Sequence, residues 1–330
     1  MNLRKVLIIR FSSLGDIVLT SLTIRALKKQ TNCEIHFLTK KGFKEIVDPN
    51  PYIDRVWLYD QNLSSLLKEL KQQGFDLIVD LHNNLRSRLV RMYLWKIPAT
   101  GYYKANLEKW LSVKFKIDRL PKKHIALRYL DALKKYSIKD DGEGLDYFIP
   151  TRDKISPDQL HLIRPYVALV IGAAHFTKRI PLHKLQELVR SIKEKYDLAI
   201  IGGKAEYETG KQLESEGVYN LCGKLSINQS ASLLEQSIVV VAPDTGMMHI
   251  AAALKKPIQS VWGSTLPEFG FWPYYGSNHP DMNISYEVAG LSCRPCARFG
   301  RDKCPKGHFH CMELQDVSTL VKQIFDRPLL

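Results

Sequence analysis

The feature that most constrains this chain is an alternation of strand-like and helix-like segments. In the first half, apolar and often β-branched runs are expected to form strands at residues 6–9, 34–38, 55–59 and 76–80, and residues 63–72 have the periodicity of a helix. Short continuous apolar runs are typical of strands that are buried on both faces. Strands that alternate with helices predict a parallel sheet covered by helices on both sides.

The alternation stops at residues 138–164 and then starts again. The run DDGEG at 140–144 and the prolines at 150, 157 and 165 indicate a linker. Beyond it we expect strands at 166–171, 198–201, 238–241 and 258–261 and helices at 182–195 and 247–254. The sequence therefore predicts an α/β protein with two doubly wound, Rossmann-like domains that face a cleft. Their predicted bounds are 1–160 and 161–330, and the last helix is expected to be able to pack back on the first domain.

The first long helix is expected to begin at Asp16 and to be amphipathic. Its predicted inward side chains are Val18, Leu22, Ile24 and Leu27, and its predicted outward side chains are Arg25, Lys28 and Lys29. This pattern is typical of a helix that covers one face of a sheet.

Ligands of open parallel sheets bind beyond the carboxyl ends of the strands, so the loops that follow strands are the candidate sites. The first such loop is RFSSLGD at residues 10–16. It lacks the glycine fingerprint of dinucleotide enzymes. Asp16 has two interpretations: it caps the helix that follows, or it is displayed as a general base. In either case the helix N-terminus should lower its pKa.

Three loops of the second domain carry residues suited to a phosphorylated ligand. In APDTGMMHIAAAL at 242–254, Asp244, Thr245 and Gly246 open a helix whose free N–H groups suit phosphate, and His249 lies one turn further on. The alternatives are a capping Asp244 and a buried histidine. The small-residue turn WGSTLP at 262–267 adds Thr265 as a contact to phosphate or ribose.

The loop GAAHFTKR at 172–179 ends in two cations. Lys178 is placed to neutralise a diphosphate, and Arg179 could assist it. The alternative is a pair of solvated surface cations.

These motifs are similar, in their order and spacing, to those of glycosyltransferase family 9, and the chain resembles its ADP-heptose:lipopolysaccharide heptosyltransferases over nearly its whole length. The resemblance implies a GT-B fold, with the acceptor mainly on the N-terminal domain and the nucleotide sugar mainly on the C-terminal one. It also implies an inverting transfer that needs no metal cofactor. Asp16 matches the family's catalytic aspartate and Lys178 its diphosphate-binding lysine. Asp244, Thr245 and Gly246 match its donor loop, whereas Ser264 stands where many members have proline.

The mechanism that follows is a single displacement. Asp16 would accept the proton of an acceptor hydroxyl, whose oxygen attacks the anomeric carbon. Lys178 and the helix end at Thr245 and Gly246 would stabilise the departing diphosphate, a task that a metal performs in other transferases. Domain closure would exclude water.

The acceptor side is predicted from the segment DLHNNLRSR at 80–88, which follows a strand. Arg86, Arg88 and the nearby Arg91 could bind a phosphorylated inner-core sugar. Together with Ser13 of the first loop, Arg86 and Arg88 are the candidate acceptor-binding residues. The alternative is a basic helix face in water.

Four cysteines crowd near the C-terminus, at Cys293, Cys296, Cys304 and Cys311. The first pair has the spacing of zinc ligands, and the others could complete a structural site. The rival interpretations are free thiols or disulfides that form only after lysis. A nucleic-acid zinc finger is disfavoured because the paired spacing and recognition helix are missing.

Composition bears on partners and compartment. The 48 Lys and Arg exceed the 34 Asp and Glu by 14, so the surface should attract polyanions such as acidic lipid or phosphorylated sugar. No apolar run approaches the roughly 20 residues of a spanning helix, and Arg10 interrupts the apolar run that a signal peptide would need. We expect a cytoplasmic protein, peripheral at the cytoplasmic face of the inner membrane. Lys and Arg would hold it there with exposed aromatics, which could equally be core residues: Trp95, Tyr102, Tyr103 and Trp110.

Three other functions compete with this one. A transferase of the same fold could use another nucleotide sugar or another acceptor. The positive charge could belong to a noncatalytic polyanion- or nucleic-acid-binding protein, but the sequence has neither an RRM pattern nor a helix-turn-helix, so no nucleic-acid partner is expected. A family member that only binds sugar is disfavoured by the presence of Asp16 and Lys178.

Overall fold

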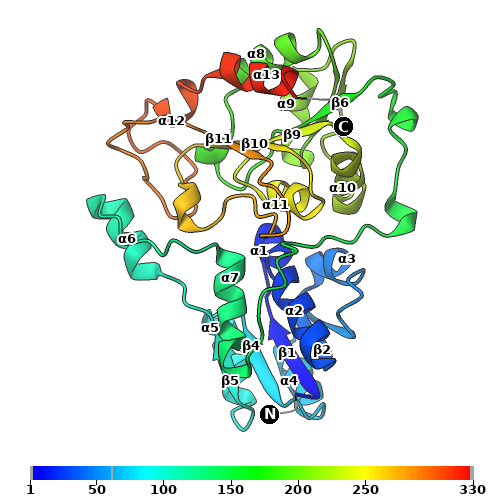
Figure 1. The fold of residues 1–330 in the computed structure, drawn as a ribbon, viewed down its shortest axis with the longest axis vertical. Coiled ribbons are helices and arrows are strands. Elements are labelled where there is room, and N and C mark those ends of the chain that lie inside the picture. The colour runs from blue at the N-terminus through cyan, green and yellow to red at the C-terminus, as the bar shows by residue number, and fades with distance from the viewer. Residues whose placement is uncertain (1–2, 61, 328–330) are drawn as a thin grey trace. The chain divides into compact units, whose positions relative to one another are not determined.

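The computed structural model describes residues 3–60 and 62–327, which form two compact units. Unit 1 contains the chain up to Lys104, with Lys123–Phe148 and Gly276–His279. Unit 2 contains Ala105–Lys122, Ile149–Tyr275 and the chain from Pro280 onward. Each unit has its own parallel sheet (Figure 1).

The sheet of unit 1 has the order β3-β2-β1-β4-β5, and all its neighbouring strands are parallel. Its strands are β1 (Lys5–Ile9), β2 (Glu34–Lys40), β3 (Arg55–Tyr59), β4 (Leu77–Asp80) and β5 (Ala99–Gly101). Ile9 lies opposite both Leu38 and Asp80, so β1 is central and its carboxyl end meets those of β2 and β4. The loop that follows β1 therefore lies at the middle of this edge.

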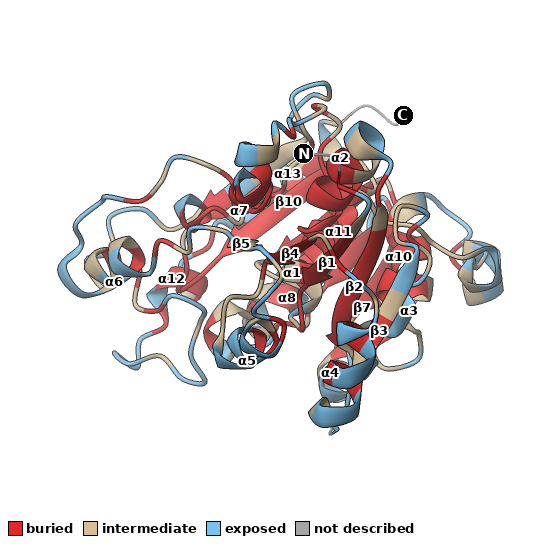
Figure 2. Cartoon of the chain, turned by 90° about the horizontal axis from the view of Figure 1, so that it is seen from below, coloured by how far each residue is buried: buried red, intermediate tan, exposed pale blue. Residues whose placement is uncertain are grey.

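The helices of unit 1 cover this sheet. They are α1 (Leu14–Val18), α2 (Ser21–Thr31), α3 (Lys44–Val47), α4 (Leu63–Lys71), α5 (Leu85–Tyr93) and α7 (Ile125–Leu130), with the 3-10 turns η1 (Lys41–Phe43) and η2 (Asp131–Tyr136). Leu70 of α4 and Val90 of α5 join Leu7 and Ile9 in one apolar cluster, while α2 packs against α7. The view in Figure 2 shows the buried strands and the exposed outer sides of α4 and α5.

The sheet of unit 2 has the order β11-β10-β9-β6-β7-β8 and is also parallel throughout. Its strands are β6 (Tyr166–Val170), β7 (Asp197–Ile201), β8 (Val218–Asn220), β9 (Val239–Pro243), β10 (Ile258–Trp262) and β11 (Asn283–Glu287). The adjacent strands β10, β9 and β6 end side by side, which brings together the three loops singled out in the sequence. The two parallel sheets confirm the predicted α/β class.

The α-helices of unit 2 include one from an early part of the chain. They are α6 (Asn106–Phe115), α8 (Leu182–Ile192), α9 (Tyr207–Lys211), α10 (Ile227–Gln236), α11 (Gly246–Ala253), α12 (His310–Glu313) and α13 (Val317–Phe325). The 3-10 turns are η3 (Thr151–Asp153), η4 (Pro157–Leu160), η5 (Phe176–Lys178), η6 (Lys204–Glu206) and η7 (Pro267–Phe269). After α6, Lys116 Nζ donates to the carbonyl of Pro295 at 2.6 Å, and α13 packs against α8.

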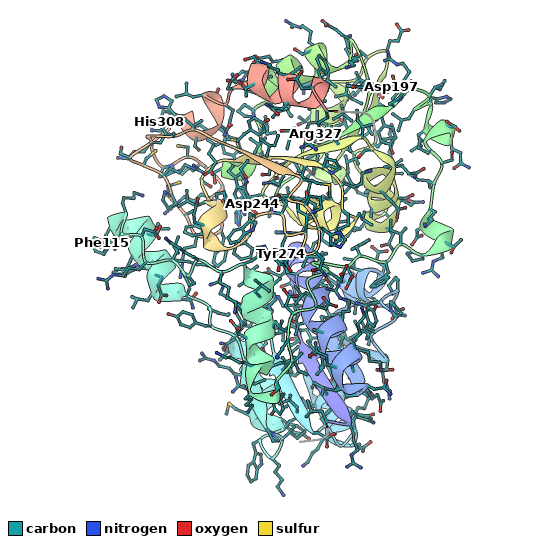
Figure 3. The ribbon with its side chains drawn as sticks, in the orientation of Figure 1. Phe115, Asp197, Asp244, Tyr274, His308 and Arg327 are labelled. Carbon is teal, nitrogen blue, oxygen red and sulfur yellow. The ribbon has the colours of Figure 1, made fainter. Side chains whose placement is uncertain are left out.

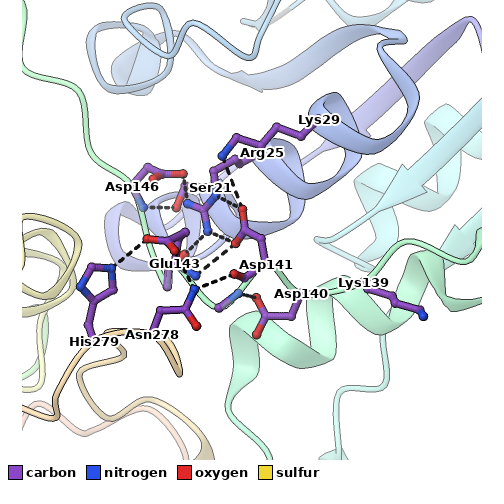
Figure 4. Close-up of polar contacts among 12 residues, drawn as sticks. Ser21, Arg25, Lys29, Lys139, Asp140, Asp141, Glu143, Asp146, Asn278 and His279 are labelled. Atoms are coloured by element: carbon purple, nitrogen blue, oxygen red, sulfur yellow. Dashed lines mark hydrogen bonds and ion pairs between the residues drawn. The ribbon is translucent and has the colours of Figure 1, made fainter.

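The first long helix differs from its prediction in two ways. It is divided into α1 and α2 around Leu19 and Thr20. Arg25, predicted to face outward, is only 2% exposed. Its Nε and Nη2 donate to the two carboxylate oxygens of Asp141 at 2.8 Å each, and it also binds Asp146 and the carbonyl of Gly144 (Figure 4). The outward placement of Arg25 was therefore wrong, because acceptors far along the chain enclose it.

The segment predicted as a linker has no α-helix or strand, only η3 and η4. Its first part is nevertheless anchored in unit 1. Glu143 accepts from Asn278 at 2.7 Å and lies 2.9 Å from His279 Nε2, which holds the short segment Gly276–His279 beside it (Figure 4). Gly276 has φ +90°, and an added Cβ would lie 2.1 Å from the carbonyl oxygen of Gly142, so only glycine fits.

Candidate functional site

Asp16 lies in the loop after β1, within the first turn of α1. The helix is capped by Ser13, so Asp16 is not the N-cap residue itself. Its Oδ2 accepts from Ser13 Oγ at 2.9 Å and forms an ion pair with Arg10 Nη2 at 2.7 Å. Its Oδ1 accepts from the Tyr129 hydroxyl of α7 at 3.0 Å. The side chain remains 21% exposed, so the carboxylate is fixed by three partners yet open to a ligand.

The pKa of Asp16 is lowered, as the sequence predicted. Burial alone would raise the pKa, but the Arg10 guanidinium and the hydrogen bonds from Ser13 and Tyr129 outweigh it. Arg10 is held in turn by the carbonyls of Ser12 at 2.7 Å and Leu81 at 2.5 Å. The result is a carboxylate that is ionised at neutral pH and can act as a weak, oriented base.

Other polar side chains lie around this pair. Burial, aided by the cations of Arg10 and Lys104, lowers the pKa of His82 to about 4, so its imidazole is neutral at physiological pH. Lys104 donates to the carbonyl of Asn83 at 2.7 Å, and burial lowers its pKa as well. Tyr102 packs edge-on against Tyr129, with ring centroids 4.6 Å apart. The surroundings of Asp16 are therefore cationic and suited to an anionic ligand.

The candidate acceptor residues of unit 1 are accessible. Ser13, Arg86 and Arg88 are exposed, the two arginines on α5. Arg91 instead lies 3.6 Å from the buried Asp80, which also accepts from the N–H of Asn83 at 2.6 Å. Asp80 and Arg91 thus fix the turn between β4 and α5, while Arg86 and Arg88 project from it.

In unit 2, residues from the three converging loops form one polar cluster. Lys178 Nζ lies 2.6 Å from Asp244 Oδ2, and Thr265 Oγ1 donates to the same oxygen at 2.9 Å. Lys178 and Asp244 are 14% and 12% exposed, so both are accessible at one edge. Asp244 is labelled in Figure 3. The structure brings together three residues predicted separately, one each from the loops that follow β6, β9 and β10.

The helix α11 begins beside this cluster. Thr245 is its N-cap and accepts from the N–H of Met247 at 3.0 Å. Gly246 is the first helical residue and is half-buried, so backbone can be approached closely there. His249 is 3% exposed and its ring centroid lies 6.4 Å from that of Phe271, which places it beneath the edge of the site.

A second layer supports the loops. Thr177 Oγ1 lies 2.8 Å from Ser264 Oγ, which couples the residues preceding Lys178 and Thr265. Arg294 Nε donates to the carbonyl of Gly263 at 2.6 Å, and its Nη2 donates to that of Thr265 at 2.8 Å. These contacts fix the turn that contains Ser264.

Arg179 is engaged elsewhere in unit 2. Its Nη2 lies 3.3 Å from Glu206, and its Nε donates to the carbonyl of Ala173 at 3.0 Å. In this arrangement Arg179 braces the loop that carries Lys178.

None of the four C-terminal cysteines, Cys293, Cys296, Cys304 and Cys311, forms a disulfide in the described structure. Burial raises the pKa of Cys311 to about 12 and also raises that of Cys296. Across residues 3–60 and 62–327, no three His, Cys, Asp or Glu side chains form a group that could hold a metal ion.

Several residues of the site could not be assigned a role from sequence. Arg10 lay inside the first motif but had no predicted function. Tyr129 reaches Asp16 from 113 positions away, and Arg294 supports a turn 29 positions before it. An arginine placed at the end of a buried strand is a usable signal for Arg10, whereas the other two depend on the tertiary fold.

The aromatics predicted at a membrane surface divide into two groups. Trp95, Tyr103 and Trp110 are exposed, by 74%, 61% and 42%. Tyr102 is partly buried and belongs to the cluster around Asp16. No helix within the described residues is long and apolar enough to cross a bilayer.

Comparison with known proteins identifies similar molecules. The model of the family described as glycosyltransferase family 9 (heptosyltransferase) matches residues 63–296. Lipopolysaccharide heptosyltransferase 1 of Pseudomonas aeruginosa is 26% identical over 323 residues, which cover 89% of this chain and 86% of the relative.

Solved structures show the same fold. ADP-heptose lps heptosyltransferase II of E. coli superposes with a TM-score of 0.68 at 20% identity, over 97% of this chain and 99% of that one. The E. coli heptosyltransferase WaaC with ADP-2-deoxy-2-fluoro heptose gives a TM-score of 0.68 at 17% identity, over 98% and 99%. These likenesses confirm the predicted GT-B fold.

Proposed function

Because the chain belongs to glycosyltransferase family 9 and is therefore a glycosyltransferase, we propose that it transfers heptose from ADP-heptose to the inner core of lipopolysaccharide. The observation that carries this proposal is the cluster of Lys178, Asp244 and Thr265 beside the N-terminus of α11. A lysine and a helix N-terminus at adjacent strand ends suit a sugar diphosphate. The donor analogue in WaaC supports the choice of sugar nucleotide.

The donor diphosphate would bind to unit 2. Lys178 would neutralise part of its charge, and the backbone N–H at Gly246 would donate a hydrogen bond. The Thr265 hydroxyl, whose proton goes to Asp244, would accept from a ribose hydroxyl. Asp244 would hold Lys178 and Thr265 in place, since both contact the same oxygen. His249, beneath this edge, would support the helix that presents Gly246.

Asp16 would serve as the base. The proton of an acceptor hydroxyl passes to its carboxylate while the hydroxyl oxygen forms a bond to the anomeric carbon. The bond from that carbon to the diphosphate oxygen breaks, and ADP leaves with the electron pair. One displacement of this kind inverts the anomeric centre. The low pKa of Asp16 favours proton transfer late in the step, when the attacking oxygen has become acidic.

Transfer is proposed to need no metal cofactor. The charge that develops on the diphosphate is the main electrostatic demand of the reaction, and preorganised donors can meet it. Lys178 and the N-terminus of α11 are two such donors in one place.

The acceptor is proposed to be lipid-linked and to bind through unit 1. Ser13 and the exposed Arg86 and Arg88 would contact its phosphorylated sugar. A lipid-linked acceptor would place the enzyme at the cytoplasmic face of the inner membrane as a peripheral protein.

The test is nucleotide release from a panel of nucleotide sugars, with and without truncated lipopolysaccharide, in the presence of EDTA. We expect acceptor-dependent ADP release from ADP-heptose. Asp16→Asn should lower kcat by about 100-fold or more, the usual contribution of a general base. Asp131→Asn, an exposed aspartate of the same unit, is the control and should leave kcat unchanged.

Each other outcome changes a defined part of the proposal. Release of a different nucleotide would replace the donor. Loss of activity in EDTA that added metal restores would overturn metal independence. Folded protein that neither turns over any donor nor binds ADP, but is retained on DNA, would favour a polyanion-binding protein.

A further inference from the structure

The helix α5 has two apolar faces. On the inner side Ser87 and Val90, with Leu94 just after the helix, are buried against the rest of unit 1. On the outer side Leu85, Leu89 and Met92 are 76%, 43% and 69% exposed. Successive residues of an α-helix are about 100° apart, so the positions of these three lie within about 60° of one another and roughly opposite the buried face. A helix that packs on a core through one face has no structural need for this second stripe.

The stripe continues past the end of the helix and has cations along it. Trp95, 74% exposed, lies two residues beyond the end of α5. Arg86 lies on one side of the stripe and Arg88 on the other, both exposed, and Lys96 is exposed beside Trp95. The chain from residue 81 to 107 has five Lys and Arg and not one Asp or Glu. The outer face of α5 is therefore apolar at its centre and purely cationic at its edges.

The neighbouring helix α4 adds a further cation beside the outer face of α5. Lys71, in the last turn of α4, lies 5.6 Å from the centre of the Tyr93 ring, and Tyr93 is 39% exposed. Both helices pack on one apolar cluster of unit 1, and Figure 2 shows their outer sides exposed. Tyrosine has an apolar ring and a polar hydroxyl, and lysine has an apolar stem and a charged end. A pair of these two side chains therefore suits a membrane interface, which is apolar on one side and polar on the other.

We propose that the outer face of α5, formed by Leu85, Leu89, Met92 and Trp95, docks unit 1 on an anionic lipid bilayer. An apolar stripe flanked by basic residues, with a tryptophan at its end, is typical of a helix that lies in the membrane interface. The charge selects anionic headgroups, and the apolar residues enter the region beneath them. The inference deepens the proposed function, on whose lipid-linked acceptor it rests, by assigning the surface that meets the lipid.

The test is sedimentation of the full chain with vesicles of phosphatidylethanolamine and phosphatidylglycerol, against vesicles of phosphatidylcholine alone. We expect binding to the anionic vesicles that weakens as salt is raised. The double variant Leu89→Ser/Met92→Ser should bind at least about tenfold more weakly, because each apolar side chain removed from water contributes about that factor. Ile163→Ser, which removes an isolated residue that is 82% exposed in unit 2, is the control and should bind like the wild type.

Trp95 gives a second readout that does not depend on affinity. Its fluorescence should shift to the blue on anionic vesicles, and the shift should be absent from Trp95→Phe. Thermal unfolding without vesicles should be the same for all these proteins, since the altered side chains are exposed. Transfer to a deacylated, water-soluble core saccharide should also be unchanged, which separates docking from catalysis: failure of transfer alone would count against the proposed function and leave the docking result standing.

Five results would overturn the docking proposal. The first is equal binding of the wild type to anionic and neutral vesicles. The second is undiminished binding by the double variant, and the third is loss of binding only when Leu107 and Trp110 of α6 are changed to serine. The fourth is a weaker affinity of the double variant for the deacylated saccharide, which would assign the face to the acceptor. The fifth is loss of a dimer in the double variant, which would assign the face to a second copy.

Discussion

The two oxygens of Asp16 have different partners, and this difference has a chemical consequence. Oδ2 is occupied by Arg10 and Ser13, both on the same loop. Oδ1 accepts from Tyr129, which comes from another helix. A proton taken from a substrate would most easily reach Oδ1, because its partner is a neutral hydroxyl rather than a guanidinium. Tyr129 therefore controls how basic the reactive oxygen is.

Replacing Tyr129 by phenylalanine should move the acid limb of the pH–rate profile to higher pH. The hydroxyl stabilises the ionised form of Asp16, so its loss raises the pKa of Asp16. Because the ionised form is the base, activity in Tyr129→Phe should fall earlier as pH decreases, while activity at alkaline pH is retained. The measurement is kcat/KM against pH, with Tyr136→Phe as the control. An acid limb that stays in place or moves to lower pH would contradict the role of Tyr129.

At the scale of elements, the turn after β10 depends on a residue without a side chain. A Cβ added to Gly263 would lie 2.5 Å from the carbonyl oxygen of Thr177 and 2.8 Å from Met312 Cε. The carbonyl belongs to the backbone directly before Lys178, so it cannot move without displacing the donor cluster. The turn and the lysine loop are therefore packed as one body.

Gly263→Ala should destabilise unit 2 by about 1–3 kcal/mol, as overpacking does, and should weaken ADP binding at the same time. Gly42→Ala is the matched control, since nothing lies within 4 Å of a Cβ added there. Thermal unfolding and calorimetry with ADP measure the two effects. An alanine variant with wild-type stability and affinity would show that the turn has room to adapt.

The ion pairs of Arg25 on α2 with Asp141 and Asp146, called the Arg25 clamp below, predict that the free energy of unfolding depends on pH in the acid range. Arg25 holds the pKa of Asp141 at about 2, below its ordinary value of 3.8. A depressed native pKa contributes stability that is complete above the ordinary value and is lost as the pH falls toward about 2. Arg25→Met should reduce stability at neutral pH by about 3 kcal/mol, because carboxylates of a part-buried pair lose their partner. It should also flatten the pH dependence of the free energy of unfolding between pH 3.8 and about pH 2.

The matched control for the clamp is Lys28→Met on the same helix. Lys28 pairs with Asp54, whose side chain is 38% exposed, and exposed pairs contribute little. The measurement is the free energy of unfolding of both variants from about pH 5 to about pH 2. This range includes about one pH unit on each side of the ordinary Asp pKa. Equal losses in the two variants would mean that the clamp adds nothing beyond a surface ion pair.

These elements also show what the sequence could and could not predict. The strands β1, β9 and β10 were predicted nearly to the residue because they are short apolar runs buried on both faces. That sufficed to bring Lys178, Asp244 and Thr265 together, since each lies in the loop that follows one of three adjacent strands. The short strands β5 and β8 and the partly exposed β11 were not predicted, because three to five residues with little apolar pattern give no periodic signal.

Long-range polar contacts are the other feature that the sequence did not predict. Arg25 has the spacing of an outward residue, and only its acceptors 116 to 121 positions away make it a buried one. Tyr129 reached Asp16 across a similar separation. Periodicity reports the average environment of an element, whereas these contacts depend on which loop returns to it.

At the scale of the whole molecule, the candidate residues for the two ligands belong to different units. Asp16 and its partners lie in unit 1, whereas Lys178, Asp244 and Thr265 lie in unit 2. The excess of 14 positive charges is thus used in two ways under the proposed function. Lys178 serves the donor, and the exposed Arg86 and Arg88 of α5 serve the phosphorylated, lipid-linked acceptor.

This division predicts that binding and catalysis can be separated by single substitutions. Lys178→Ala should weaken ADP binding by about 10- to 100-fold, the value of a hydrogen bond to a charged group, because the diphosphate loses its cation. Asp16→Asn should leave the affinity for ADP unchanged while it lowers kcat. Lys184→Ala, whose lysine pairs with the exposed Glu187 at 3.5 Å, controls for loss of charge in unit 2. The measurement is calorimetry with ADP on the three variants. If Asp16→Asn loses as much affinity for ADP as Lys178→Ala does, nucleotide binding depends on both units. The assignment of one ligand to each unit would then be wrong.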